Sequence, residues 1–226
     1  MKTLNVIAMV LFSLQLFAQE STPKKTISSI VQREDKLILN LTSDNWGSLS
    51  PEIKSKPFRS RGFSFLLMNE RMNKTGNFGF GAGVGFMSQN VHTNAFPQEA
   101  GYNNSSSILV TIPDSLYDIN KLSLNFITAA IELRIHTNLN EQRERFKINL
   151  GFLAGYLVQS HTKFDGKYGK YKSYNIKNIN KLQYGLVARI GYSNYAINGY
   201  FSLVDVFKTG KGPELIPYSI GISFTF

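Results

Sequence analysis

The sequence contains no cysteine among its 226 residues, only one tryptophan and only three histidines. Without cysteine there can be no disulfide, no thiolate metal ligand, no cysteine nucleophile and no lipidated N-terminal cysteine. Beyond the first twenty residues, no uninterrupted apolar run approaches the roughly 18 residues that a transmembrane helix needs. The remaining way for this chain to span a membrane is as a closed β-barrel.

Acidic residues are scarce relative to basic ones. The chain has 25 Lys and Arg against 15 Asp and Glu, which gives a formal net charge of +10. Such an excess is compatible with nucleic acid, an anionic membrane or acidic ligands as partners. The composition does not shift after the first twenty residues, which favours a single domain.

The N-terminal residues have the pattern of a secretory signal peptide. A charged start at Lys2 is followed by the apolar run Leu4 to Phe17 and a small-residue exit at Ala18-Gln19. A single membrane anchor is the alternative, but the run is shorter than the roughly 20 residues that span a bilayer. We therefore predict a cleaved signal peptide over 1–19, a periplasmic tail over 20–35 and an outer-membrane barrel over 36–226. Export makes nucleic acid an unexpected partner.

Three segments alternate between apolar and small or polar residues, which predicts strands with one apolar face. They are 216–226, 78–86 and 182–192, and the second sets four glycines opposite its aromatic and aliphatic residues. Glycine suits the narrow interior of a small barrel, where side chains from facing strands need room. Tyr184 and Tyr192 resemble the aromatic girdles at membrane interfaces.

Five further segments alternate in the same way: 37–41, 63–67, 127–135, 146–158 and 195–203. The expected fold class is therefore all-β, a transmembrane antiparallel up-and-down barrel of about eight strands. The connections fit, because 70–77, 137–145 and 193–194 are shorter than 42–60, 88–121, 159–181 and 204–214, as periplasmic turns are shorter than outer loops. A soluble β-sandwich or lipocalin-like barrel is the alternative, and it would leave a string of glycine and serine in water.

Charged residues at inward-facing positions predict an interior charge cluster near the periplasmic end. The residues are Glu132, Arg134, Lys147 and Arg189, and Glu70 and Lys36 could join them. Charges in so narrow an interior must be paired or hydrated. A salt-bridge plug is the preferred interpretation, and a gated ion path is the alternative.

The third outer connection interleaves basic and aromatic residues. These are Lys163, Lys167, Tyr168, Lys170, Tyr171, Lys172 and Tyr174. Charge attraction and stacking would allow such a loop to contact anionic lipopolysaccharide or an acidic surface glycan. A solvated loop without a ligand is the alternative.

A catalytic site is not expected. Ser160, His161 and Asp165 form the only local set that could resemble a serine hydrolase, which needs nucleophile, base and carboxylate within hydrogen-bond reach. Neighbouring residues on a strand point to opposite faces, so Ser160 and His161 would face apart. We therefore predict a protein that is not an enzyme and has no catalytic residue, cofactor or metal. A lipid A-modifying enzyme is the less favoured alternative.

Several segments resemble those of PorT-like outer-membrane β-barrel proteins of Bacteroidota. The similar segments are the leader end Phe17-Ala18-Gln19, residues 124–134, residues 151–157 and the terminal run 219–226. The resemblance implies an outer-membrane barrel surrounded by lipid bilayer and lipopolysaccharide. It also suggests an accessory role in type IX protein secretion, with envelope or secretion proteins as partners. By resemblance to other barrels, the terminal Phe226 would be the signal that the barrel-assembly machinery reads.

Overall fold

The computed structural model describes residues 32–226, without the side chains of 32–35 and Asn104, so the predicted signal peptide lies outside the described residues. The strands are β1 (Gln32–Gly47), β2 (Arg61–Met72), β3 (Phe78–His92), β4 (Ala95–Ala100), β5 (Ser106–Thr111), β6 (Tyr117–His136), β7 (Phe146–Gly166), β8 (Gly169–Tyr174), β9 (Leu182–Tyr192), β10 (Tyr195–Ser202) and β11 (Ile216–Thr225). Short 3-10 helices, η1 (Tyr102–Asn104) and η2 (Asp114–Leu116), flank β5. No helix in this described part is long and apolar enough to cross a membrane.

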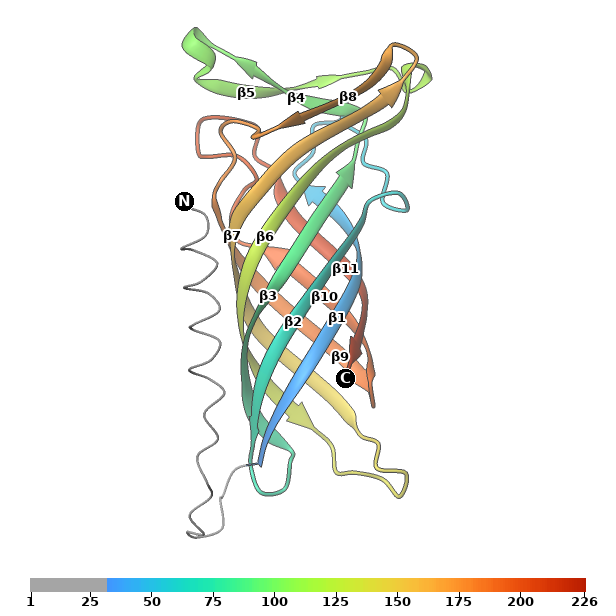
Figure 1. Cartoon of the computed structure of the whole chain (residues 1–226), viewed down its shortest axis with the longest axis vertical. Coiled ribbons are helices and arrows are strands. Elements are labelled where there is room, and N and C mark those ends of the chain that lie inside the picture. The colour runs from blue at the N-terminus through green and yellow to red at the C-terminus, as the bar shows by residue number, and fades with distance from the viewer. Residues whose placement is uncertain (1–31) are drawn as a thin grey trace, which may run out of the picture.

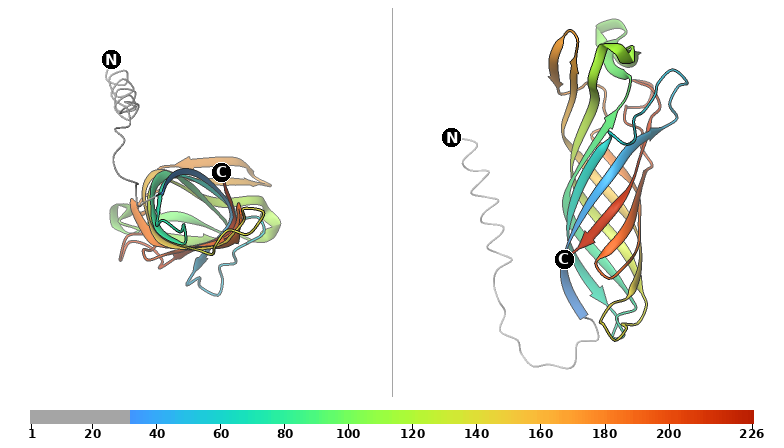
Figure 2. Two further views of the ribbon diagram at one scale, coloured as in Figure 1. Left: turned by 90° about the horizontal axis from the view of Figure 1, so that it is seen from below. Right: turned by 90° about the vertical axis from the view of Figure 1, so that its right-hand side faces the viewer.

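Eight of these strands close into an antiparallel barrel in the order β1-β2-β3-β6-β7-β9-β10-β11 (Figure 1). The ring is evident when the molecule is seen along its long axis (Figure 2). The last strand pairs with the first, with Leu39 opposite Phe224 and Leu41 opposite Ile222. The predicted eight-stranded barrel and its closing strand pair are therefore confirmed.

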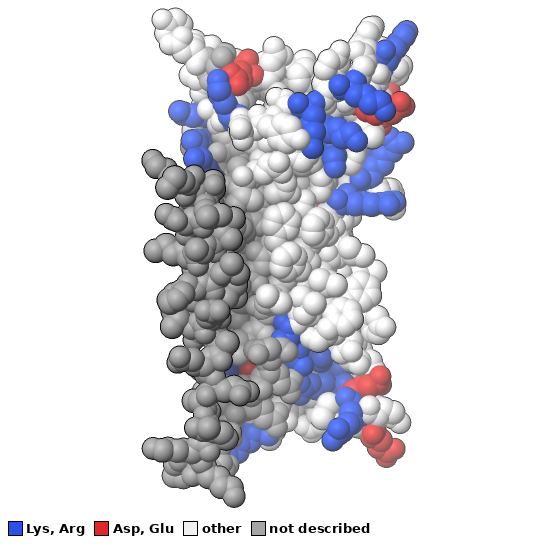
Figure 3. All heavy atoms as spheres, in the orientation of Figure 1, with Lys and Arg blue, Asp and Glu red and all other residues white. Residues whose placement is uncertain are grey.

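The outer surface of the barrel is apolar, and the inner surface is mostly polar or small. Leu41, Ile131 and Ile220 are each at least 60% exposed, whereas their inward neighbours Asn40 and Ser219 are buried. A soluble protein has the opposite arrangement, with apolar side chains inside and polar ones outside. Exposing an apolar surface of this extent to water would be energetically unfavourable. Figure 3 shows the corresponding uncharged belt between two ends that carry Lys and Arg. The soluble alternative is therefore wrong.

An aromatic row marks the periplasmic edge of this belt, as outer-membrane barrels require. The strand registers place Phe146, Tyr192, Tyr195 and Phe224 side by side across β7, β9, β10 and β11. The rings of Tyr195 and Phe224 meet edge to face at 5.8 Å. Beyond them, the backbone N–H of Phe226 donates to the carbonyl of Leu37 at 2.8 Å, so the end of the chain remains paired to β1.

Glycines on the inner face of β3 make room for long side chains, as predicted. A Cβ atom at Gly83 would lie 2.5 Å from the sulfur of Met68, and one at Gly81 would lie 3.0 Å from Nε of Arg134. Both distances are shorter than van der Waals contact. The absence of a side chain at Gly83 and Gly81 therefore leaves the room that the side chains of Met68 and Arg134 occupy.

The strands are longer than the alternation predicts. β1 begins at Gln32, before the predicted barrel start at residue 36, and β7 continues to Gly166. The predicted outer loops 88–121 and 159–181 also contain the β4–β5 hairpin and β8. The prediction missed these extensions because it followed the apolar face, whereas a strand leaving the membrane needs only hydrogen-bonded neighbours and can carry polar residues on both faces. β6 and β7 supply each other with those partners as far as Tyr117 and Gly166.

Side chains fill the interior of the barrel. An apolar layer formed by Ile38, Leu66, Met68, Phe126 and Leu153 crosses its middle. Val206, Phe207 and Leu215, from the β10–β11 connection, are buried as well. The cavity that reaches Asn40 and Arg189 within the barrel has a volume of only about 40 Å³. Such filling is typical of eight-stranded barrels.

Candidate functional site

Ionisable side chains from three strands meet in the interior near the periplasmic end. The interior charge cluster consists of Glu70, Glu132, Arg134 and Arg189, all of them buried. Arg189 donates a hydrogen bond to Oε1 of Glu132. Nη2 of Arg134 lies 3.1 Å from Oε2 of Glu132, and Nη1 of Arg134 lies 3.5 Å from Oε2 of Glu70. Two cations and two anions therefore balance one another.

The structure brings together three of the four predicted members of this cluster and adds Glu70. Lys147 is half-buried at the start of β7, opposite His136, and forms no ion pair with a described acidic residue. It differs from the prediction because its partner His136 is four residues beyond Glu132 on β6, which puts Lys147 two inward-facing rows from the carboxylates, toward the periplasmic mouth. Lys36 is half-buried on β1, in register with Met68. His136, which the prediction did not include, places Nδ1 3.9 Å from Oε1 of Glu70.

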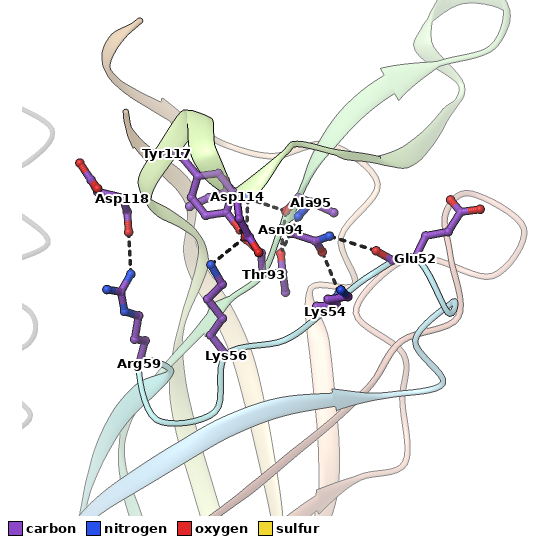
Figure 4. Close-up of polar contacts among 11 residues, drawn as sticks. Glu52, Lys54, Lys56, Arg59, Thr93, Asn94, Ala95, Asp114, Tyr117 and Asp118 are labelled. Carbon is purple, nitrogen blue, oxygen red and sulfur yellow. Dashed lines mark hydrogen bonds and ion pairs between the residues drawn. The ribbon is translucent and has the colours of Figure 1, made fainter. Parts of the chain in front are cut away.

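At the extracellular end, the first and second outer connections are tied together by polar contacts (Figure 4). Nζ of Lys56 lies 2.9 Å from Oδ1 of Asp114, and the Tyr117 hydroxyl donates to the same oxygen at 2.5 Å. We call these three residues the loop latch. Beside it, Asn94 accepts a hydrogen bond from the backbone N–H of Lys54 at 2.7 Å. The latch fixes the base of the β4–β5 hairpin against the β1–β2 connection.

The loop latch should weaken in acid. The Tyr117 hydroxyl and the Lys56 ammonium both donate to Asp114 and hold the pKa of that carboxyl below its ordinary 3.8. A depressed pKa stabilises the latch above pH 3.8, and this contribution is lost as the pH falls through the native value. At neutral pH, Asp114→Asn should therefore speed exchange of the Lys56 amide, which is bonded to the His92 carbonyl, by about two- to fivefold.

Hydrogen exchange corrected for intrinsic rates would measure this effect, and the difference between the two proteins should shrink as the pH falls below 3.8 and vanish once the pH is below the depressed pKa of Asp114. Asp118→Asn is the matched control, because Arg59 binds the carbonyl oxygen of Asp118 rather than its carboxylate. Equal acceleration by both substitutions would contradict the latch.

β7 and β8 form a hairpin whose two faces differ in chemistry. Lys163 lies opposite Lys172, and Phe164 lies opposite Tyr171. Because the side chains of a strand alternate, the lysines share the outer face and the aromatic rings share the inner one. The predicted basic and aromatic loop is therefore a two-stranded structure that separates the two kinds of residue.

The inner face of this hairpin and the β4–β5 region enclose an open cleft of about 530 Å³. Its principal apolar lining residues are Phe96, Ile112, Leu116, Phe164, Tyr168 and Tyr171. The rings of Phe164 and Tyr171 lie 6.2 Å apart, and the Tyr171 hydroxyl donates to the Tyr168 carbonyl at 2.6 Å. Tyr168 and Tyr171 belong to the predicted set. The others were missed, although Phe96 stands out as an aromatic residue in a polar connection.

Cations surround the cleft, and some are paired. Lys170 lies 2.9 Å from Asp165, and this contact raises the pKa of the lysine. Lys177, just after β8, lies 2.9 Å from Glu99 of β4 and so joins the two walls of the cleft. Lys167 is exposed at the hairpin turn, next to Tyr168.

The possible hydrolase residues do not come together. The Ser160 hydroxyl accepts a hydrogen bond from the backbone N–H of Ile176 at 3.0 Å. The ring of His161 packs against Tyr174 at 5.6 Å, and Asp165 pairs with Lys170. Within the described part of the chain, no hydrogen bond joins these three residues to one another, and no group of three His, Asp or Glu residues could hold a metal ion.

An eight-stranded barrel with a lipid-facing apolar belt, a filled interior and extended strands at one end defines a small outer-membrane β-barrel protein. The chain belongs to the outer membrane protein beta-barrel domain family, whose model matches residues 39–208. This places the protein in the outer membrane, in contact with the bilayer. The match does not show membership of the PorT-like group, so a role in type IX secretion rests on the resemblance alone.

No curated protein matches the sequence significantly. Among solved structures, the barrel is similar to Ail, the attachment invasion locus protein of Yersinia pestis, which was crystallised with the heparin analogue sucrose octasulfate. The two sequences are 12% identical, and the match covers 86% of this chain and 99% of the other, with a TM-score of 0.35.

Proposed function

We propose that the protein is a non-enzymatic surface module of the outer membrane that binds an acidic glycan in the extracellular cleft. The observation that carries this proposal is an open cleft of about 530 Å³ that combines aromatic walls with nearby lysines. Cavities of this size accommodate small ligands. The apolar faces of sugar rings pack well on aromatic rings, and ammonium groups attract their carboxylate or sulfate substituents.

The walls of the cleft are held in place before any ligand arrives. The loop latch supports the β4–β5 hairpin from below, and the Lys177–Glu99 contact joins that hairpin to the segment after β8. The backbone N–H of Ser107 also donates to the Lys211 carbonyl at 2.9 Å, which ties β5 to the β10–β11 connection. A preformed cleft avoids part of the ordering cost of binding.

Removing the aromatic walls should abolish most of the binding. The double variant Phe164→Ala, Tyr171→Ala is expected to weaken binding at least about tenfold, because two stacking surfaces are lost together. The measurement is binding of the purified barrel to an array of uronic-acid and sulfated oligosaccharides, with neutral dextran of equal length for comparison. Tyr102→Ala is the control, because Tyr102 is 88% exposed on η1 and does not line the cleft.

The outcomes separate the parts of the proposal. Binding of acidic but not neutral oligosaccharides, lost in the double variant and kept in Tyr102→Ala, supports an acidic-glycan site. Equal binding of dextran would reject the role of charge. Failure of the native protein to retain any member of the array would reject the proposed function.

A further inference from the structure

The outer face of the extended sheet carries a line of cations that the cleft does not use. Lys121 of β6 is directly opposite Lys163 of β7, and Lys163 is directly opposite Lys172 of β8. We call these three residues the lysine row. Lys121 has the same strand parity as Ile127, which is 59% exposed on the lipid-facing surface. The lysine row therefore continues the membrane-facing surface upward.

The lysine row has no acidic counterpart on the protein. The ion pairs of the described extracellular residues join Lys56, Lys170 and Lys177 to carboxylates, but none includes a member of the row. Asp165, the acidic residue two positions after Lys163, is already paired with Lys170 at 2.9 Å. Like charges directly across neighbouring strands repel each other. An external anion would relieve that repulsion.

Neutral contacts hold two of these lysines in place. Nζ of Lys121 donates to Oδ1 of Asn90 at 2.9 Å, and Ser123 donates to the same oxygen at 2.6 Å. Nζ of Lys172 lies 4.8 Å from the centre of the Tyr174 ring. These partners orient the ammonium groups without neutralising them.

The height of the lysine row matches the polar layer of the outer leaflet. Val158, the last strongly exposed apolar residue of β7, precedes Lys163 by five positions. At roughly 3.3 Å per residue and a strand tilt of about 40°, the lysine backbone lies about 12 Å above that edge of the belt. Figure 3 shows Lys and Arg side chains gathered above the uncharged belt. At this height, the sugars and phosphates of an outer-leaflet glycolipid begin.

We propose that the lysine row binds phosphate groups of the lipopolysaccharide that surrounds the barrel. Adjacent strands lie about 4.8 Å apart, so neighbouring ammonium groups can contact the oxygens of one phosphate. Clusters of lysine near a membrane surface are attracted to anionic headgroups in this way. The site is distinct from the glycan cleft, because it occupies the opposite face of the same hairpin.

The test compares two forms of one probe. Purified lipopolysaccharide, either intact or chemically dephosphorylated, is titrated into the full-length barrel in zwitterionic micelles. The native protein should bind the intact form at least about tenfold more tightly, because several charge-assisted contacts depend on the phosphates. Lys163→Gln, Lys172→Gln should remove this preference. Lys208→Gln, Lys211→Gln removes the same charge from exposed residues of the β10–β11 connection and should leave it unchanged.

Folding and the neighbouring cleft are controlled separately. A heat-dependent shift in gel migration confirms that each variant is a folded barrel, and Lys172→Gln alone provides a milder change on β8, which lies outside the closed ring. This single variant should lose part of the preference for intact over dephosphorylated lipopolysaccharide. The double variant Phe164→Ala, Tyr171→Ala should keep the whole preference, even if the glycan proposal fails. A native protein that does not distinguish the two probes, or a row variant that still does, would overturn the inference.

Discussion

Replacing Glu132 by Gln should destabilise the folded barrel by about 3 to 5 kcal/mol, the usual effect of breaking a buried ion pair. Glu132 contacts both Arg189 and Arg134, and its side chain is 1% exposed. Glutamine has nearly the same volume but no charge. The substitution leaves two buried guanidinium groups with only Glu70 to balance them.

Urea titration in micelles, followed by the fraction of the folded gel band, measures this loss. Glu99→Gln is the control, because its contact with Lys177 is exposed and should contribute less than about 1 kcal/mol. The double variant Glu132→Leu, Arg189→Leu removes one charge of each sign and should recover much of the stability. A loss in Glu132→Gln no larger than that in Glu99→Gln would show that the interior charge cluster is hydrated rather than a salt-bridge plug.

Gly221→Ala should prevent most of the chain from closing into a barrel. Gly221 lies on β11, opposite Thr42 of β1, in the strand pair that closes the ring. An added Cβ would overlap the carbonyl oxygen of Leu41 and lie 2.7 Å from Cα of Thr42. These are backbone atoms, which cannot move aside as a flexible side chain can, so the two strands must separate.

Gly199→Ala supplies a closely matched control. Gly199 lies on β10, opposite Ile220 of β11, and the nearest atom to its added Cβ is the Ser219 carbonyl oxygen at 4.0 Å. The measurement is the fraction of each refolded protein that migrates as the compact, heat-modifiable form. We expect a native-like fraction for Gly199→Ala and a small one for Gly221→Ala. A native-like yield from both would mean that β1 and β11 can shift past each other without cost.

The strands could be predicted because each one alternates between apolar residues that face the lipid and small or polar residues that face the interior. In 216–226, apolar residues alternate with small and polar ones, and β11 does present Tyr218, Ile220 and Ile222 to the outside. Strand ends were predicted less well. β7 passes Val158 and continues to Gly166 through Lys163 and Asp165. Beyond Val158 neither face of the strand contacts the apolar part of the membrane, so the alternation of apolar and polar residues no longer indicates a strand.

The binding surfaces were predicted by composition but not by arrangement. The content of lysine and tyrosine in 161–174 identified the β7–β8 hairpin as unusual. Only the register between β7 and β8 shows that Phe164 and Tyr171 face one way and Lys163 and Lys172 the other. Lys121 could not have been assigned to the lysine row, because it lies far from the other two lysines in sequence.

The sequence by itself determined that this chain forms a membrane barrel closed by the strand that ends near Phe226, because residues two positions apart share a face whatever their partners are. The tertiary structure alone decided which side chains meet across that barrel. Glu70, Glu132 and Arg189 come from three strands, and Phe96 reaches the cleft from a hairpin far from Tyr171 in sequence. Such contacts depend on the stagger between strands, and one residue of slippage would exchange every inward group for an outward one.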